Sequence, residues 1–281
     1  MFVKAYAKIN LFLDVVAKRG DGYHDLNMVM LPLELHDAIE VETSPVLSDS
    51  FITTDHVDLQ ITKYNLINST LEKMKKKYGF KQNFIIKVHK EIPISAGLGG
   101  GSSNSAATIK AIKHLTKLKI PQEEEIALGA SLGADVPFCL MNVPAHVEGI
   151  GEKVTPIKMK KKFDVIIIKP SQGLSTRKVF ELADSMELEH SNIDNVITAL
   201  ENGDEELLAK SLFNSLEKPS ISLLPEIQNV KDELKKLGFK MVLMSGSGSS
   251  VFALTSNHKF ATSKYHELEK KGYEVYLTRT L

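Results

Sequence analysis

Apolar and polar residues alternate at the start of the chain, over residues 5–14. Ala5, Ala7, Ile9, Leu11 and Leu13 fall on one side of this repeat, while Tyr6, Lys8, Asn10, Phe12 and Asp14 fall on the other. Successive side chains of a β-strand point to opposite faces, so strict alternation predicts a strand. Lys8 and Asn10 should therefore project from the same face of that strand.

The rest of the first half predicts both strands and helices. After a glycine-rich turn at residues 18–25, strands are predicted at residues 27–35, 38–44 and 83–92. Helical apolar spacing covers residues 66–78, ended by Gly79, and residues 103–118. Pro121 opens a further helix that Gly133 ends, and its positive first turn suits the three glutamates at 123–125. Residues 134–141 are predicted to form a strand or an extended segment.

The second half has the same mixture of elements. Strands are predicted at residues 163–171, 240–246, 250–256 and 273–278, and helices between residues 176 and 237 and over residues 260–271. A change of composition at residues 153–164 suggests a domain boundary there. We therefore predict an α+β protein of two domains, residues 1–157 and residues 158–281.

Composition excludes several classes of protein. The 281 residues carry a formal net charge of zero, so no global charge attracts nucleic acid or anionic lipid. The peptide KMKKK occurs at residues 73–77 and 158–162, where solvated surfaces are favoured over a nucleic-acid patch. The single cysteine, Cys139, rules out an internal disulfide. With no signal sequence and no long apolar run, we expect a cytoplasmic protein without a membrane segment.

The stretch PISAGLGGGSSNSAATIKAI, residues 93–112, is the most informative part of the sequence. A strand, a glycine-rich turn and a helix together form an anion-binding site, because helix N-termini expose unpaired N–H groups. A Walker A loop would need lysine after its last glycine, yet Ser102 follows Gly101. A dinucleotide-binding fingerprint would need an early βαβ unit. A purely structural turn is the alternative.

Three other features favour phosphoryl transfer over a structural turn. A second glycine–serine segment, SGSGSS at residues 245–250, joins two apolar strands. Asp135 lies among apolar neighbours, just before Pro137, and is held there either structurally or for chemistry. Lys8 lies in the middle of an apolar strand. Phosphate-binding loops together with a buried cation and a carboxylate are the parts that phosphoryl transfer requires.

These segments resemble the three motifs of the GHMP kinases. The matching segments are AYAKINLFLDV, PISAGLGGGSSNSAAT and MSGSGSSVFAL, with KYNLI and LGADVPF at family spacing between them. The resemblance covers nearly the whole chain. It implies a two-domain α+β GHMP kinase fold with the active site in the cleft between an N-terminal ATP-binding domain and a C-terminal domain.

The resemblance also implies where ATP binds. ATP would lie along the glycine loop, with its phosphates against the helix that Ser103 begins, and Asn65 would lie near the nucleotide. The cofactor-binding residues are then Asn65, Pro93, Ile94, Ser95, Ala96, Gly97, Leu98, Gly99, Gly100, Gly101, Ser102 and Ser103. No acidic ligand for Mg²⁺ is evident in this loop, so the metal would be held mainly by ATP, Ser103 and water.

The same resemblance assigns the catalytic and acceptor-binding residues. Asp135 would be the catalytic base and Lys8 its partner, because a nearby cation favours the charged carboxylate. The segment GDGYHDL indicates the branch of the family that phosphorylates the 2-hydroxyl of a cytidine-diphosphate-linked alcohol. Tyr23, His24 and Phe180 would then hold the cytosine. The other acceptor-binding residues would be Asn10, Thr176, Gly246, Ser247 and Gly248.

Two alternatives stay open from the sequence. A GHMP kinase for another small alcohol, such as mevalonate or homoserine, would keep the loops and lose the cytosine pocket. A nucleotide-binding regulator without catalysis would need neither Lys8 nor Asp135, so their presence argues against it. A nucleic-acid module is disfavoured by the charge balance. We expect a monomer or a homodimer.

Overall fold

The computed structural model describes residues 1–56 and 65–281. The chain folds into two compact units, and each unit is discontinuous in sequence. Unit 1 consists of residues 1–7, 35–94 and 99–142, and unit 2 consists of residues 8–34, 95–98 and 143–281. The domain boundary predicted between residues 157 and 158 stays a prediction, because these units are not continuous stretches of the sequence. The units are grouped differently because the long strands β1 (Phe2–Lys18) and β2 (His24–Ser44) contribute to both.

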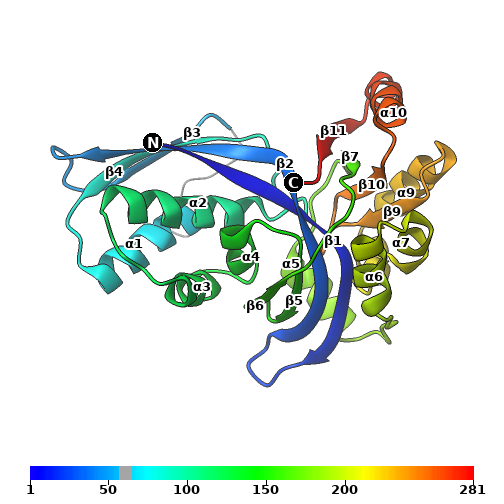
Figure 1. Ribbon diagram of the computed structural model, residues 1–281, viewed down its shortest axis with the longest axis horizontal. Coiled ribbons are helices and arrows are strands. Elements are labelled where there is room, and N and C mark those ends of the chain that lie inside the picture. The colour runs from blue at the N-terminus through cyan, green and yellow to red at the C-terminus, as the bar shows by residue number, and fades with distance from the viewer. Residues whose placement is uncertain (57–64) are drawn as a thin grey trace. The chain divides into compact units, whose positions relative to one another are not determined.

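Unit 1 is a sheet with helices on one side (Figure 1). Within it, strand order is β3-β4-β2-β1, with β4 antiparallel to β2 and parallel to β3. Helix α1 packs against α2, and α4 packs against α2 and α3. Besides the ends of β1 and β2, the elements are β3 (Phe51–Thr54), α1 (Leu66–Tyr78), β4 (Asn83–His89), α2 (Gly100–Leu115), α3 (Gln122–Ala130) and α4 (Val136–Met141).

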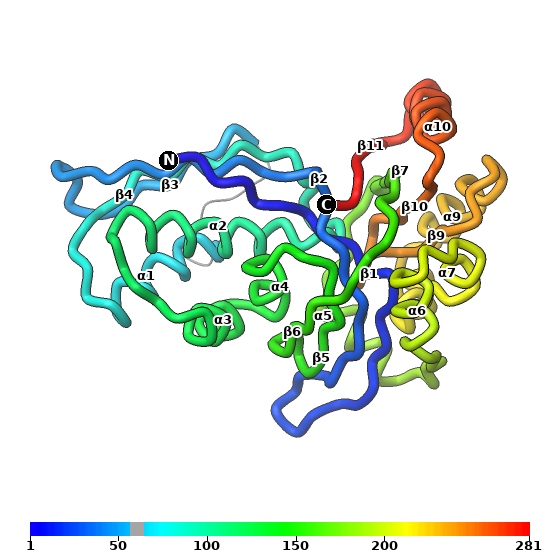
Figure 2. The backbone as a smooth tube through the Cα atoms, viewed as in Figure 1, coloured from blue at the N-terminus to red at the C-terminus, as the bar shows by residue number. Residues whose placement is uncertain are grey.

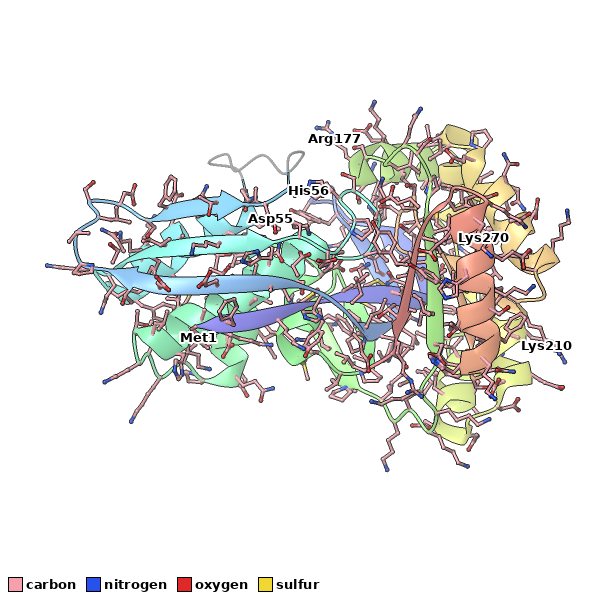
Figure 3. All side chains as sticks on the ribbon, turned by 90° about the horizontal axis from the view of Figure 1, so that it is seen from above. Met1, Asp55, His56, Arg177, Lys210 and Lys270 are labelled. Atoms are coloured by element: carbon pink, nitrogen blue, oxygen red, sulfur yellow. The ribbon has the colours of Figure 1, made fainter. Side chains whose placement is uncertain are left out.

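Unit 2 contains a second sheet of order β11-β7-β10-β9, in which the neighbouring strands are antiparallel. Its helix α10 packs against β7, β10 and β11, and Figure 3 shows α10, which ends at Lys270, lying along that sheet. The elements of this part are β7 (Asp164–Lys169), α5 (Thr176–Ala183), α6 (Asp194–Asn202), α7 (Glu205–Ser211), α8 (Glu217–Leu223), α9 (Glu226–Lys236), β9 (Met241–Met244), β10 (Val251–Thr255), α10 (His258–Lys270) and β11 (Glu274–Arg279).

The rest of unit 2 is built around the long β1–β2 hairpin, whose connecting turn is seen in Figure 2. Strand β5 (Ala145–Gly149) is antiparallel to β2 and to β6 (Lys153–Pro156), while the short β8 (Phe213–Asn214) runs parallel to β1. The middle of β1 is buried on both faces from Ala7 to Val15. The predicted strand therefore exists, and its polar face, which carries Lys8 and Asn10, is as inaccessible as its apolar face.

Most predicted elements are confirmed. The helix at residues 66–78 has the predicted bounds, and Gly79 ends it in a left-handed conformation. The two apolar strands predicted on either side of residues 245–250 are β9 and β10, which pair as an antiparallel hairpin. The predicted α+β class is confirmed by the two sheets and their covering helices. No helix of residues 1–56 and 65–281 has both the length and the apolar composition needed to span a membrane.

Two predictions of extended structure were wrong. Residues 136–141, predicted to be extended, form helix α4, because Pro137 stands in the first turn, where its missing N–H is not needed. The separate strands predicted at 27–35 and 38–44 are one strand, β2. Asp37 does not end it, since its fully buried carboxylate binds Lys90 Nζ at 2.5 Å and accepts from the backbone of Glu91 and Ile92.

Candidate active site

The first glycine segment, residues 97–103, leads into helix α2, which begins three residues earlier than predicted. Gly99 is the N-cap in a left-handed conformation (φ 70°), and Ser103 N–H already donates to the Gly99 carbonyl at 2.9 Å. The N–H groups without an acceptor inside the helix are therefore those at its beginning, on Gly100, Gly101 and Ser102. The predicted start of the helix at Ser103 was wrong, because two glycines were taken as loop. The anion-binding position moves to the glycines themselves.

The side chains of Ser103 and Asn65 bond to the backbone of β1 and α1, near the start of α2 in unit 1. The Ser103 hydroxyl donates to the Tyr6 carbonyl at 2.7 Å and is buried. The Asn65 side chain caps α1 by accepting from Ile67 N–H at 2.9 Å. A methyl group on Gly101 would lie 3.5 Å from Leu66, which follows Asn65. The structure thus brings Asn65 near the predicted phosphate loop. Lys63 and Tyr64 of the KYNLI motif lie outside the described residues.

Asp135 stands at the N-terminus of α4, in unit 1. Its side chain is partly exposed rather than buried. Its backbone carbonyl accepts from Cys139, and within the described residues its carboxylate makes no capping hydrogen bond to α4. The carboxylate is therefore not needed to cap its own helix, which leaves the chemical interpretation of Asp135 open to test.

The two glycine segments meet in unit 2. Residues 95–98 pack against residues 245–250: Ser245 Oγ donates to the Gly97 carbonyl at 3.0 Å, and Ser250 N–H donates to the Ala96 carbonyl at 3.3 Å. Gly97 has a φ of 74°, and a side chain there would collide with the Ser245 carbonyl. Only glycine satisfies both conditions. Segments about 150 positions apart in the sequence are thus fixed to each other.

Lys8 and Asn10 lie beside this junction. Lys8 Nζ donates to Asn10 Oδ1 at 2.8 Å, and both side chains are buried. A methyl group on Gly246 would lie 3.3 Å from Lys8 Nζ and 3.6 Å from Asn10 Oδ1. The cation therefore lies against the backbone of the second glycine segment. Lys8 N–H also donates to the Leu98 carbonyl at 3.0 Å, which joins β1 to the first segment.

The second glycine segment is buried and anchored from several sides. Its Ser247 hydroxyl is 2.9 Å from the hydroxyl of Thr176, another residue predicted to bind the acceptor. Asn214 donates to the carbonyls of Met244 and Gly246 at 2.9 and 2.8 Å. Glu217 accepts from Met244 N–H at 2.9 Å. Sequence reasoning missed Asn214 and Glu217, which precede the segment by about thirty positions and have no pattern that points to it.

The three predicted base-binding residues all lie in unit 2, and two of them are in direct contact. The rings of His24 and Phe180 are stacked, with centroids 4.7 Å apart and planes at 29°. His24 Nε2 is 2.7 Å from Asp184 Oδ1, and the other oxygen of Asp184 binds Lys18 Nζ at 2.6 Å. Tyr23, beside His24, is 58% exposed. Asp184 was missed, although it follows Phe180 by four residues and stands directly after α5 as its C-cap.

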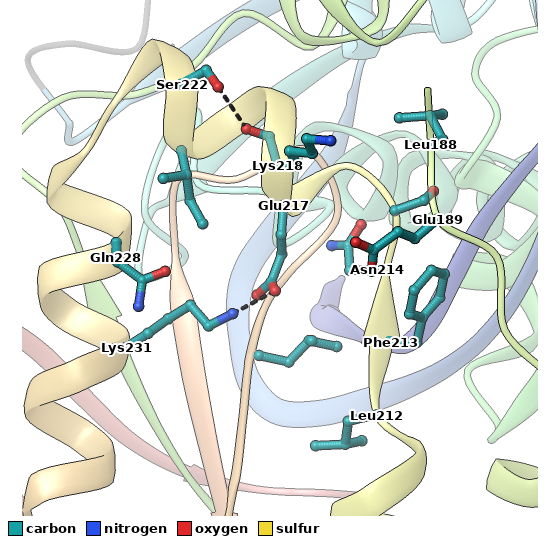
Figure 4. Close-up of a pocket in the computed structure, with 13 residues that line it drawn as sticks. Leu188, Glu189, Leu212, Phe213, Asn214, Glu217, Lys218, Ser222, Gln228 and Lys231 are labelled. Atoms are coloured by element: carbon teal, nitrogen blue, oxygen red, sulfur yellow. Dashed lines mark hydrogen bonds and ion pairs between the residues drawn. The ribbon is translucent and has the colours of Figure 1, made fainter. Parts of the chain in front are cut away.

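A cavity of about 440 Å³ lies elsewhere in unit 2, lined by residues of β8, α8, α9 and β9 (Figure 4). Its polar wall includes the ion pair of Glu217 and Lys231, and Lys218, Asn214 and Gln228 also line it. Asn214 and Glu217 already bond to the backbone of residues 244–246. None of the predicted site residues lines this cavity. Two residues of the cavity wall thus hold the second glycine segment, and the cavity itself is not part of the candidate site.

Ser103 was predicted as the one protein contact to Mg²⁺. The described residues contain no group of three histidine, cysteine or acidic side chains that could hold a metal. Next to Ser103, Asn104 has a buried side-chain oxygen that finds no hydrogen-bond partner in the described part of the chain. Hydroxyl and amide oxygens are suitable ligands for Mg²⁺, which keeps several of its waters in proteins. The residues present thus fit a metal held largely by the nucleotide.

Known proteins similar to this chain share its whole length. Residues 65–143 match the GHMP kinases N terminal domain and residues 196–274 match the GHMP kinases C terminal model. A curated relative from Clostridium beijerinckii, 4-diphosphocytidyl-2-C-methyl-D-erythritol kinase, is 38% identical over 100% of both chains.

Solved structures give the same result. A crystal structure of 4-(cytidine 5'-diphospho)-2C-methyl-D-erythritol kinase has a TM-score of 0.82 and 29% identity, covering 100% of this chain and 99% of its own. A homoserine kinase from Cytophaga hutchinsonii, at 16% identity and a TM-score of 0.72 over 100% of this chain and 94% of its own, shares the fold alone. The two-domain α+β fold predicted from the motifs is confirmed, and this chain belongs to the GHMP kinase family of ATP-dependent small-molecule kinases.

Proposed function

We propose that this protein uses ATP to phosphorylate 4-diphosphocytidyl-2-C-methyl-D-erythritol, at the 2-hydroxyl, in non-mevalonate isoprenoid precursor synthesis. The names of its full-length relatives support this acceptor. The observation that carries the proposal is the stacked pair of His24 and Phe180 beside Tyr23, since a nucleobase is recognised by aromatic faces and hydrogen bonds. Mevalonate and homoserine carry no base, so a kinase for either would not need such a group.

We propose that the two glycine segments divide the substrates between them. The N–H groups that begin α2, on Gly100, Gly101 and Ser102, would receive the phosphates of ATP, with Asn65 near the nucleotide. Gly246, Ser247 and Gly248 would receive the diphosphate of the acceptor, with Thr176 and Asn10 beside them. Glycine is suited to both tasks, because a backbone without side chains can approach phosphate oxygens closely.

The chemistry uses residues of this chain as follows. The acceptor hydroxyl loses its proton to the Asp135 carboxylate while its oxygen bonds to the γ-phosphorus of ATP, and the bond to the β-phosphate oxygen breaks to release ADP. The buried Lys8 cation, held by Asn10, would stabilise the negative charge that develops during transfer. Mg²⁺, when bound with ATP, would neutralise phosphate charge, and Ser103 would contact it.

The proposal is tested by ADP release across a panel of alcohols. Purified protein is assayed with ATP, Mg²⁺ and one acceptor at a time: 4-diphosphocytidyl-2-C-methyl-D-erythritol, mevalonate or homoserine. We expect turnover with the cytidine-linked acceptor and none with the other two. Turnover of mevalonate or homoserine in place of the cytidine-linked alcohol would keep the family assignment and overturn the proposed acceptor. If no ADP is released with any of the three acceptors, a nucleotide-binding regulator without catalysis would be favoured.

A further inference from the structure

The two ring nitrogens of His24 have different surroundings. Nε2 is 2.7 Å from Asp184 Oδ1, whereas Nδ1 takes part in none of the hydrogen bonds of the described residues. The ring is held on one face by Phe180 and on one edge by Asp184, and its side chain is only 9% exposed. The imidazole therefore has a fixed plane and one nitrogen left for a ligand.

Asp184 is ionised in this arrangement. Its Oδ2 accepts from Lys18 Nζ at 2.6 Å, and this hydrogen bond, followed by that of His24, lowers the pKa of the Asp184 carboxyl. An ionised carboxylate can only accept hydrogen bonds. Nε2 of His24 must therefore carry the hydrogen, and in the neutral ring Nδ1 is left with a lone pair.

We propose that Asp184 is a positioning residue that fixes the tautomer of His24 and thereby makes the site choose cytosine over uracil. The inference rests on the proposed function, because it assumes a base-linked acceptor. Cytosine offers an exocyclic N4 amino donor where uracil has the O4 acceptor. A lone pair on Nδ1 accepts from the amino group and repels O4. With the opposite tautomer, an Nδ1–H would instead favour O4, so the preference depends on Asp184.

The test compares acceptors that differ only in the base. The KM and kcat of wild type and Asp184→Asn are measured with the cytidine-linked acceptor and with its uridine-linked counterpart. An amide can donate or accept, so asparagine permits either tautomer. We expect the KM for the cytidine-linked acceptor to rise about ten-fold and the preference over the uridine-linked one to fall by about the same factor. The kcat and the KM for ATP should stay as in wild type.

Two further variants separate positioning from structure. Glu181→Gln removes a carboxylate from α5, the helix that Asp184 directly follows. Glu181 pairs only with Arg177 in the described hydrogen bonds and is 58% exposed, so this variant should behave as wild type. Asp184→Glu keeps an acceptor-only group and should keep the base preference. An equal loss of base preference in Glu181→Gln would overturn the positioning role of Asp184. So would a lower melting temperature together with a raised KM for ATP in Asp184→Asn.

The outcomes for wild type and variant are distinguishable. A wild type that ignores the cytidine-linked acceptor overturns the proposed function and this inference together. A wild type that prefers the cytidine-linked acceptor, with an unchanged preference in Asp184→Asn, overturns this inference alone. A lost preference in Asp184→Asn, restored in Asp184→Glu, supports both.

Discussion

The two glycine–serine segments, residues 97–103 and residues 245–250, are alike in composition and different in surroundings. The first leads into α2, whose first N–H groups have no acceptor inside the helix, and Gly101 there is exposed. The second turns between β9 and β10 and is buried throughout. The element that follows a glycine segment therefore decides how its backbone is presented: a helix start exposes unpaired N–H groups, whereas the hairpin packs its turn among other residues.

The segments are also anchored by different forces. The stretch of backbone that leads into the first glycine–serine segment is held by the buried ion pair of Asp37 and Lys90, in unit 1. The turn of the second is held by neutral amide donors from Asn214, while Glu217, which pairs with Lys231, holds Met244 just before the turn, in unit 2. A buried ion pair is costly to break, because the remaining charge has no partner. The two segments should therefore respond differently to the loss of one anchor.

Removing the predicted base should have the largest effect and should leave binding by both segments intact. Asp135→Asn is expected to lower kcat by roughly 10²–10⁴, the usual contribution of general base catalysis. Both KM values should stay near those of wild type, since Asp135 belongs to neither segment. Steady-state kinetics with each substrate varied checks this. Asp55→Asn, which neutralises an exposed carboxylate of unit 1, is the control, and normal turnover in Asp135→Asn would refute the base assignment.

Breaking the anchor of the first segment should destabilise the protein more than loosening that of the second. Asp37→Asn leaves the Lys90 cation buried without its counter-charge and should cost about 3–5 kcal/mol of unfolding free energy. Asn214→Ala leaves two buried carbonyls without their donor and should cost roughly 1–3 kcal/mol. Urea denaturation of both variants measures the difference. A larger loss in Asn214→Ala would reverse the comparison of the anchors.

Truncating Tyr23 should affect the acceptor and spare ATP. Stacking of a base on an aromatic ring contributes roughly 1–3 kcal/mol, so Tyr23→Ala should raise the KM for the acceptor about five- to 150-fold. Because Tyr23 is 58% exposed, the melting temperature should barely change. Phe51→Ala removes an equally exposed aromatic ring, at 58%, from β3 and should alter neither KM. Equal damage to both substrates, with a lower melting temperature, would mean that Tyr23 is a packed turn residue.

Much of the fold could be predicted because its patterns are local. The alternation in β1, the apolar stripe of α1 with Gly79 after it, and the hairpin around residues 245–250 each depend on neighbouring residues. Residues 136–141 could not be predicted, because an apolar run with a proline near its start suits an extended segment as well as a first helical turn. The start of α2 was misplaced because glycine is a poor helix former, yet two glycines begin this helix.

The candidate site was predictable in its motifs and not in its supports. Lys8 and Asn10 on one strand face were expected from alternation. The family resemblance named His24 and Phe180 as residues that hold a base, but it did not predict that their two rings stack on each other. The supporting residues Asp37, Asn214 and Asp184 act over distances of tens of residues or more along the chain. Their roles depend on which backbone groups and side chains the tertiary fold leaves unsatisfied, and no local pattern contains that information.

The division of substrates between the two segments is tested most directly by comparing Gly101→Ala with Ser247→Ala. A methyl group on Gly101 meets only an ordinary contact with Leu66 at 3.5 Å, so the fold should tolerate it while it obstructs a phosphate. Ser247→Ala removes the hydroxyl that faces Thr176. We predict that the KM for ATP rises about ten-fold in Gly101→Ala alone, and that the KM for the acceptor rises about five-fold in Ser247→Ala alone. An increase of the same KM in both variants would contradict the division.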